Sequence, residues 1–452
     1  MRSTCGSLSC AKTDLGRTSV SVQVWPSSTP YLSVPTGSLN GMSGRRARAK
    51  RKAAQSSSAG TAPGGPWTLT GGAVEARRAR IATVKHLRTA PIARLIQVTR
   101  LQSACELHAA HVGNAKAARA LVFGGMGYRP PYPTDLQRAA EMVVADEAGY
   151  LAGADLYVLT PQMCDVVIAA AQTLSVQDQE LWDEDDLPSR SGVVVLPHPI
   201  IVKTVGGDLG DLRALTWHTP MQIEYTSPGM PPRVERRQAV RVSVYNDTHG
   251  PTRPDSFLAL AAQARAMGTP LPPLLLDAIR CVPFRNVVTA DQIESLQGFS
   301  ELARQAGEAM REANAAQGFN EERVISEYVS GSQIEDSDDT FAIRFLYAFW
   351  RLCEQRIAAV DQTEVGPTAR LQAERAAVRA EVRIVQLRRT DKHRDAASTG
   401  RDWKHRWIVR MHKVRQWYPS LQRHKVIYRG PYIKGLDDKP LLGGEPVRGL
   451  TR

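Results

Sequence analysis

The sequence predicts an α+β protein with a disordered start, and three observations support this fold class. Apolar residues recur at three- and four-residue intervals in several segments, as they do on the buried side of amphipathic helices. Other segments are short runs rich in Val, Ile and Leu, which is typical of strands. The first 66 residues are instead rich in Ser, Gly, Thr and Pro, so they bury too little apolar surface to offset chain entropy.

The chain has 452 residues, enough for two or three domains, and its 42% hydrophobic residues can fill their cores. The patterns divide the chain into five regions. They are a disordered basic tail (1–70), a helical unit (71–150), a mixed α/β region with antiparallel strands (151–297), a helical segment (298–380) and a small basic, aromatic C-terminal β-unit (381–452).

The tail contains one dense run of positive charge, R-R-A-R-A-K-R-K. Such a run can hold phosphates electrostatically, and it can equally be part of a solvated tail. The tail residues predicted for electrostatic binding are Arg45, Arg46, Arg48, Lys50, Arg51 and Lys52.

The helical unit shows helical spacing of apolar residues between Val74 and Val122, and Pro91 should divide this stretch into two helices. The loop 124–133 contains G-G-x-G. It lacks the preceding strand and the glycine spacing of a phosphate-binding loop, so it is predicted to be a plain turn. A further helix is predicted over 136–148.

The mixed region begins with a predicted strand at 154–160 and a helix at 161–174 whose first residue is Pro161, as helices prefer. The segment 181–196 contains the acidic run W-D-E-D-D, which we expect to be an exposed turn, and then a buried strand. Paired acids can also hold Mg²⁺ or carry out acid–base chemistry. Further strands are predicted at 200–203, 212–217, 221–225 and 240–245.

The last of these strands alternates Val240, Val242 and Val244 with polar neighbours, which predicts an antiparallel sheet with one exposed face. A Pro-rich connection with a helix near Leu274–Ile279 follows. The remaining predicted helices are 298–315, 339–360 with a broad apolar face, and 368–380.

The C-terminal unit has the most distinctive composition. Between Arg383 and Lys434 there are fifteen Lys or Arg residues against three acids, with three of the eight Trp and four of the ten His. Basic side chains interleaved with aromatic ones suit an anionic, stackable partner such as single-stranded nucleic acid. A net charge of +13 also favours acidic partners. The same composition fits a compact β-unit with a merely solvated cationic face.

Strands predicted at 382–388, 405–412 and 425–429 would form a small antiparallel sheet, with Trp407 on its packed face. The opposite face would present guanidinium groups, which bind phosphate or carboxylate in a bidentate manner. The residues predicted for binding are Arg406, Arg410, His412, Lys413, Arg415, Arg429, Tyr432 and Lys434.

Motifs for catalysis are absent from the sequence. It has no P-loop, no G-x-S-x-G elbow and no kinase pattern. His108 and His111 form H-x-x-H without a recognisable third ligand, and the six cysteines include no C-x-x-C pair. We therefore predict no catalytic residues, no metal and no cofactor. The main alternative is a metal-dependent nuclease that uses Asp391, His393 and Asp395 with nearby basic residues.

The sequence also indicates where the protein acts. The N-terminus lacks the apolar core of a signal peptide, and no apolar run approaches the roughly eighteen residues of a membrane helix. Scattered cysteines are typical of a reducing compartment. We therefore expect a cytoplasmic protein that does not bind membranes.

Five segments carry a resemblance. They are L-P-S-R-S-G-V-V-V-L-P-H-P-I, L-R-A-L-T-W, V-R-I-V-Q-L-R-R, W-K-H-R-W-I-V-R-M-H-K-V-R-Q-W-Y-P and P-Y-I-K-G-L-D-D-K-P-L. In this order, over roughly residues 150–450, they resemble a largely uncharacterised family of actinobacteria, their phages and plasmids. That family is similar to one class of anti-CRISPR proteins acting on type V-A systems.

The resemblance implies a non-enzymatic accessory protein of a mobile element that recognises RNA, a nascent peptide or a ribonucleoprotein. In the anti-CRISPR members this recognition interferes with production of the effector nuclease. Besides the nuclease, a second alternative is a structural interaction protein with a cationic surface.

Overall fold

The computed structural model describes residues 67–226, 234–253, 255–318, 333–336, 338–388, 407–409, 411–430 and 432–434. The predicted tail up to residue 66 lies outside the described residues.

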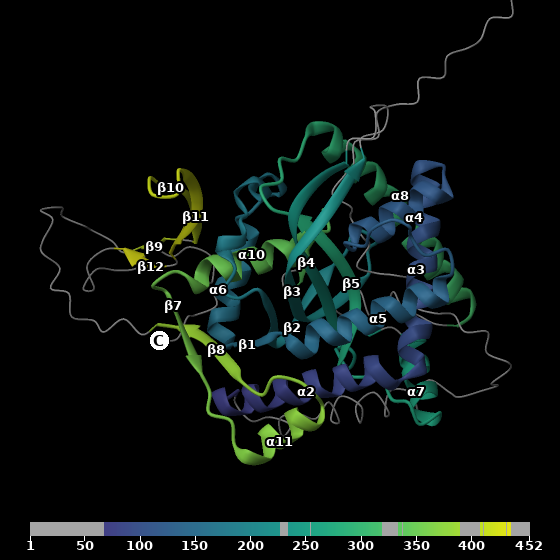
Figure 1. Cartoon of the computed structure of the whole chain (residues 1–452), viewed down its shortest axis with the longest axis horizontal. Coiled ribbons are helices and arrows are strands. Elements are labelled where there is room, and N and C mark those ends of the chain that lie inside the picture. Colours follow the sequence, from purple (N-terminus) through teal and green to yellow (C-terminus); the bar gives the residue numbers. More distant parts are fainter. Residues whose placement is uncertain are drawn as a thin grey trace, which may run out of the picture.

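A mixed eight-stranded sheet forms the centre of the molecule, and it confirms the α+β prediction (Figure 1). Its order is β5-β4-β3-β2-β1-β8-β7, with β6 paired to β2. The strands β1, β2 and β8 are parallel, as is the short pair of β2 with β6, and the other pairs are antiparallel. The strands are β1 (Asp155–Leu159), β2 (Ser191–Lys203), β3 (Leu209–Thr226), β4 (Val234–Asp247), β5 (Leu274–Pro283), β6 (Ile334–Glu335), β7 (Ala358–Gln362) and β8 (Val382–Leu387).

Helices cover both faces of the sheet. One core joins α6 and α10 to side chains such as Leu159, Val194 and Val242. The other core joins α2 and α5 to the opposite face, which includes Val158 and Val193. The helices are α2 (Leu69–Thr89), α3 (Pro91–Val112), α4 (Ala115–Gly125), α5 (Leu136–Gly153), α6 (Pro161–Gln172), α7 (Asp255–Ala266), α8 (Ala290–Ala316), α10 (Phe341–Cys353) and α11 (Pro367–Arg375).

Because both faces are covered, the prediction of an exposed face on β4 is wrong. Arg241, Ser243 and Tyr245 are as buried as the valines that alternate with them. The buried guanidinium of Arg241 is paired with Glu147 of α5, which compensates its charge. A polar residue at an alternating position therefore did not indicate a solvated face here.

Local signals explain where several helices begin and end. Pro91 is the first residue of α3, and Thr160 caps α6 by accepting a hydrogen bond from the Met163 amide at 3.3 Å. Both starts were predicted. The break between α3 and α4 was not: Gly113 ends α3 with φ of 68°, a conformation that favours glycine, and Asn114 caps α4.

The predicted helix near Leu274–Ile279 is wrong, because these residues form β5. Short apolar runs do not distinguish a buried strand from a buried helix. This run pairs with β4 as an antiparallel strand along its whole length, with Val242 opposite Arg280. The helix of this connection is α7, which precedes the strand.

The predicted three-stranded C-terminal sheet is also wrong. Strand β8 lies inside the main sheet, parallel to β1 and with Val382 and Val385 fully buried. In the described residues of the rest of the unit, the strands form two separate two-stranded pairs. These are β10 (His412–Tyr418) with β11 (Arg423–Arg429), and β9 (Trp407–Val409) with β12 (Tyr432–Lys434).

At the start of β2, the backbone of Gly192 lies directly against the indole of Trp217. A Cβ at Gly192 would lie 2.1 Å from the Trp217 ring, so only glycine fits beneath this side chain. The indole Nε1 of Trp217 donates to the Ser189 carbonyl at 2.8 Å. Within the described ranges, no helix is both long and apolar enough to span a membrane.

Candidate interaction surface

The hairpin β10–β11 stands at the outer side of the molecule, beside α10 (Figure 1). Its register is regular from His412 opposite Arg429 to Tyr418 opposite Arg423. The connecting turn is closed by a hydrogen bond of 3.1 Å from the Leu421 amide to the Tyr418 carbonyl. The hairpin is therefore a defined structural element that can present side chains at fixed positions.

Apolar packing and two hydrogen bonds anchor the inner half of the hairpin to α10 and to the residues that follow it. Val426 and Tyr428 are buried in the same core as α10. The Arg351 Nε donates to the Val426 carbonyl at 2.9 Å, and the Tyr428 amide donates to Gln355 Oε1 at 3.1 Å.

Ion pairs attach the hairpin to the acidic 3₁₀ turns η1 (Val176–Leu181) and η2 (Glu184–Asp186). On β10, Lys413 pairs with Asp178, and Arg415 bridges Asp178 and Glu180. On β11, Arg423 bridges Asp183 and Asp185, and Lys425 pairs with Asp186 at 2.9 Å.

The innermost part of this network is closed to solvent. Asp186 is fully buried and lies 3.1 Å from Arg351 Nη1 and 2.9 Å from Lys425 Nζ. Arg351 also pairs with Glu354. Burial lowers the pKa of Arg351, but the Asp186 and Glu354 carboxylates raise it above its ordinary value. The charges of these groups compensate one another inside the protein, and their ion pairs hold the hairpin in place.

The expectation of an exposed acidic turn at Asp183–Asp186 is therefore wrong. Asp183 and Asp186 are buried, whereas Asp185 is 71% exposed. The positive charges that pair with these acids come from Arg285, β11 and α10, all more than 100 residues further along the chain. Burial raises the pKa of Asp178, but hydrogen bonds from Lys413 and the Ser175 amide bring it below its ordinary value.

The structure divides the predicted binding residues into four groups. Lys413 and Arg415 are engaged in the ion pairs above, while His412 and Arg429 are exposed and lie directly opposite each other. For Tyr432 and Lys434 the structure describes the backbone only, in β12 opposite Val409 and Trp407. Outside the described residues lie Arg406, Arg410 and the six basic residues of the tail, Arg45, Arg46, Arg48, Lys50, Arg51 and Lys52.

Sequence reasoning missed the outer end of the hairpin. Trp417 is 42% exposed and stands opposite His424, with ring centroids 5.0 Å apart. Leu421 in the turn is exposed as well. An aromatic residue two positions before a proline turn, between Arg415 and Arg423, is the signal that could have identified this end.

The two histidines of H-x-x-H have packing roles. His108 is buried and stacks on Phe299 of α8 at 4.5 Å between ring centroids, and burial lowers its pKa to about 4. His111 meets the edge of the same ring. In the part of the chain that the structure describes, no group of three or more His, Cys, Asp or Glu could hold a metal ion. Asp391, His393 and Asp395 lie outside this part.

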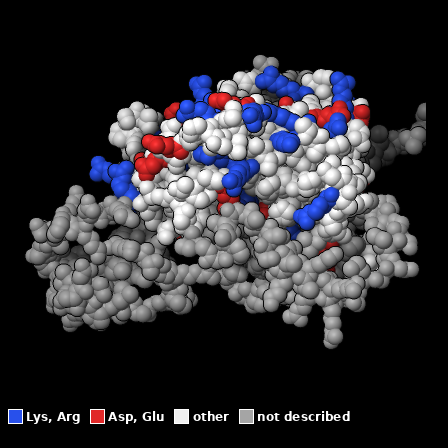
Figure 2. All heavy atoms as spheres, turned by 90° about the horizontal axis from the view of Figure 1, so that it is seen from below, with Lys and Arg blue, Asp and Glu red and all other residues white. Residues whose placement is uncertain are grey.

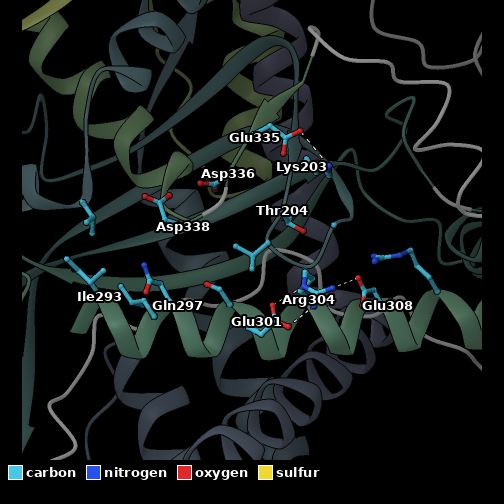
Figure 3. Close-up of a pocket in the computed structure, with 16 residues that line it drawn as sticks. Lys203, Thr204, Ile293, Gln297, Glu301, Arg304, Glu308, Glu335, Asp336 and Asp338 are labelled. Atoms are coloured by element: carbon cyan, nitrogen blue, oxygen red, sulfur yellow. Dashed lines mark hydrogen bonds and ion pairs between the residues drawn. The ribbon is translucent and has the colours of Figure 1, made fainter. Parts of the chain in front are cut away.

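A hollow of about 770 Å³ lies between α8 and the turn that joins β2 to β3 (Figure 3). It was not predicted from the sequence, because its walls come from four separated segments, which include Val176, Thr204, Gln297 and Asp338. Burial raises the pKa of Asp336 on its wall, and the neighbouring carboxylates of Asp339 and Asp338 add to this rise.

The charged side chains that line this hollow are all paired with one another or with a neighbour. The pairs are Lys203–Glu335, Arg304–Glu301, Arg304–Glu308, Arg311–Asp208, Arg344–Asp336 and Arg344–Asp338. A charged ligand would have to displace one of these partners. The hairpin is the stronger candidate for a functional surface, because its exposed Arg429 has no carboxylate partner in the described ranges.

Charged side chains of both signs lie on one face of the described protein. On the face drawn in Figure 2, basic and acidic side chains are interspersed. A comparison with models of known protein families found no match, and neither did a comparison with curated proteins. The resemblance to the anti-CRISPR-like family stays a prediction.

Proposed function

We propose that this protein is a non-enzymatic binding protein and that its basic C-terminal unit binds single-stranded RNA. The observation that carries the proposal is the charge of this unit, fifteen Lys or Arg residues against three acids between Arg383 and Lys434. Such a unit attracts phosphates whatever the base sequence. A nascent peptide or a ribonucleoprotein would be recognised through the same unit.

The hairpin contributes in a specific way to this proposal. Internal carboxylates engage Lys413, Arg415, Arg423 and Lys425, which hold the hairpin on the body. Arg429 is exposed and has no carboxylate partner in the described ranges, and exposed His412 lies opposite it. Arg429 can therefore meet a phosphate without first giving up a carboxylate partner.

The resemblance found in the sequence supports an accessory role of the anti-CRISPR type, in the cytoplasm of the host cell. The recognition is proposed to act without turnover, as in the members that the family resembles.

Binding to a short labelled RNA at increasing salt tests the proposal. Affinity should fall steeply as salt rises, because each neutralised phosphate releases counterion. Arg429→Gln should weaken binding and reduce the slope of log affinity against log salt by about 0.7, the contribution of one contact to a single strand.

Arg78→Gln is the matched control, since this exposed arginine on α2 changes net charge equally and lies far along the chain from the hairpin. It should leave the slope unchanged. If the control and the Arg429 variant behave alike, binding is a general charge effect and the assigned rung is wrong. Wild-type protein that binds no RNA at low salt contradicts the proposed function.

A further inference from the structure

The outer end of the β10–β11 hairpin carries an exposed aromatic side chain on a fixed backbone. Trp417 is the next-to-last residue of β10, and its register with His424 is set by the ladder. Trp417 is 42% exposed, which is unusual for so large an apolar residue. A rigid, exposed indole is a surface on which another flat ring can stack.

Arg415 lies on the same face of the strand, two residues before Trp417 and therefore about 7 Å away along the strand. Its guanidinium has two different partners. Buried Asp178 accepts from Nη2 at 3.2 Å, and Glu180, which is 39% exposed, accepts from Nη1 at 2.8 Å. Asp178 thus positions the Arg415 side chain. Nη1 is paired with Glu180, which solvent and ligands can reach.

We propose that this end of the hairpin binds one nucleotide of a single strand, with the base stacked on Trp417 and the phosphate on Arg415 in place of Glu180. This inference rests on the proposed function, because it takes nucleic acid as the ligand. The base must be unpaired, since a base inside a duplex is stacked between its neighbours. His424 beside the indole adds a second group that can donate to the ligand.

The charge arrangement argues for nucleic acid rather than an apolar partner at this position. A purely apolar partner would leave the Arg415–Glu180 pair desolvated without a new partner, which is unfavourable. A phosphate oxygen replaces the carboxylate of Glu180 with equivalent chemistry, and guanidinium groups bind phosphate well. Glu180 then becomes a competitor of the ligand.

This competition gives a test with effects of opposite sign. Fluorescence anisotropy of a fluorescein-labelled oligouridylate measures affinity. Trp417→Ala should weaken binding at least about fivefold, and Trp417→Phe should retain most of it, because base stacking requires an aromatic ring. Glu180→Gln should tighten binding about two- to fivefold, the range expected for release of an exposed ion pair. A mutation that merely damages the fold would not tighten binding.

Leu421→Ala is the control, because Leu421 is exposed at the same end but belongs to the turn. It should leave affinity unchanged, and a duplex of the same length should bind more weakly than the single strand. If wild type binds RNA but neither Trp417→Ala nor Glu180→Gln changes its affinity, the proposed nucleotide site is wrong and the proposed function stands. If Leu421→Ala costs as much as Trp417→Ala, the end makes an apolar contact and the inference is overturned. If wild type binds no RNA, both fail.

Discussion

Asp186→Asn should lower the free energy of unfolding by about 3–5 kcal/mol, because it leaves two buried cations without their carboxylate. Asp186 is fully buried between Arg351 and Lys425, and Asn preserves its shape while removing its charge. Urea denaturation followed by far-UV circular dichroism measures the loss. Glu354 compensates part of the positive charge, which places the expected value toward the lower end of the range.

Asp185→Asn is the matched control for this prediction. Asp185 is the neighbouring residue of the same turn and pairs with Arg423, but it is 71% exposed. Its replacement should change stability by no more than about 0.5–1 kcal/mol, as exposed ion pairs do. Equal losses in the two variants would mean that the hairpin is not held by the buried part of the network.

Glu147→Gln should destabilise the protein by a similar amount, about 3–5 kcal/mol, at a site unrelated to the hairpin. Glu147 Oε1 accepts from Arg241 Nε at 3.0 Å and Nη2 at 2.8 Å, and Tyr245 donates its hydroxyl to Oε2 at 3.0 Å. All three side chains are buried between α5 and β4. Removing the charge leaves the Arg241 guanidinium uncompensated, and thermal or urea unfolding measures this directly.

Two further variants examine the cause of that loss. Glu141→Gln on the same helix removes an acid from an exposed pair with Arg94 and should stay within about 0.5 kcal/mol of wild type. Replacing both partners by apolar residues, Glu147→Leu with Arg241→Met, should cost less than the sum of the single changes. Strict additivity would contradict the assignment of the loss to an unpaired buried charge.

The parts of the fold that depend on local sequence could be predicted. Helix starts at Pro91 and Pro161 follow from proline's preference for the first turn, and the broad apolar face of α10 follows from its periodicity. The fold class itself needs only these patterns. A short apolar run such as Leu274–Ile279 fits either a strand or a helix, so its secondary structure does not follow from the run alone.

The parts that depend on distant partners could not be predicted. Strand β8 pairs with β1 more than 200 residues before it, and Lys413 meets Asp178 across 235 residues. The sequence does not show whether a basic residue contacts water, a phosphate or an internal carboxylate. For this reason His412 and Arg429 were predicted as surface groups in agreement with their exposure, while the internal pairing of Lys413 and Arg415 was missed.

The central claim is that this protein binds without turnover, and incubation with excess labelled single-stranded RNA and DNA tests it most directly. The mixtures contain Mg²⁺ or Mn²⁺ in one arm and EDTA in the other. We expect the bound fraction of RNA to saturate at a fixed ratio to protein, the strands to stay intact, and EDTA to leave binding unchanged. Metal-dependent cleavage that Asp391→Ala or Asp395→Ala abolishes would contradict the claim and would identify the protein as a nuclease.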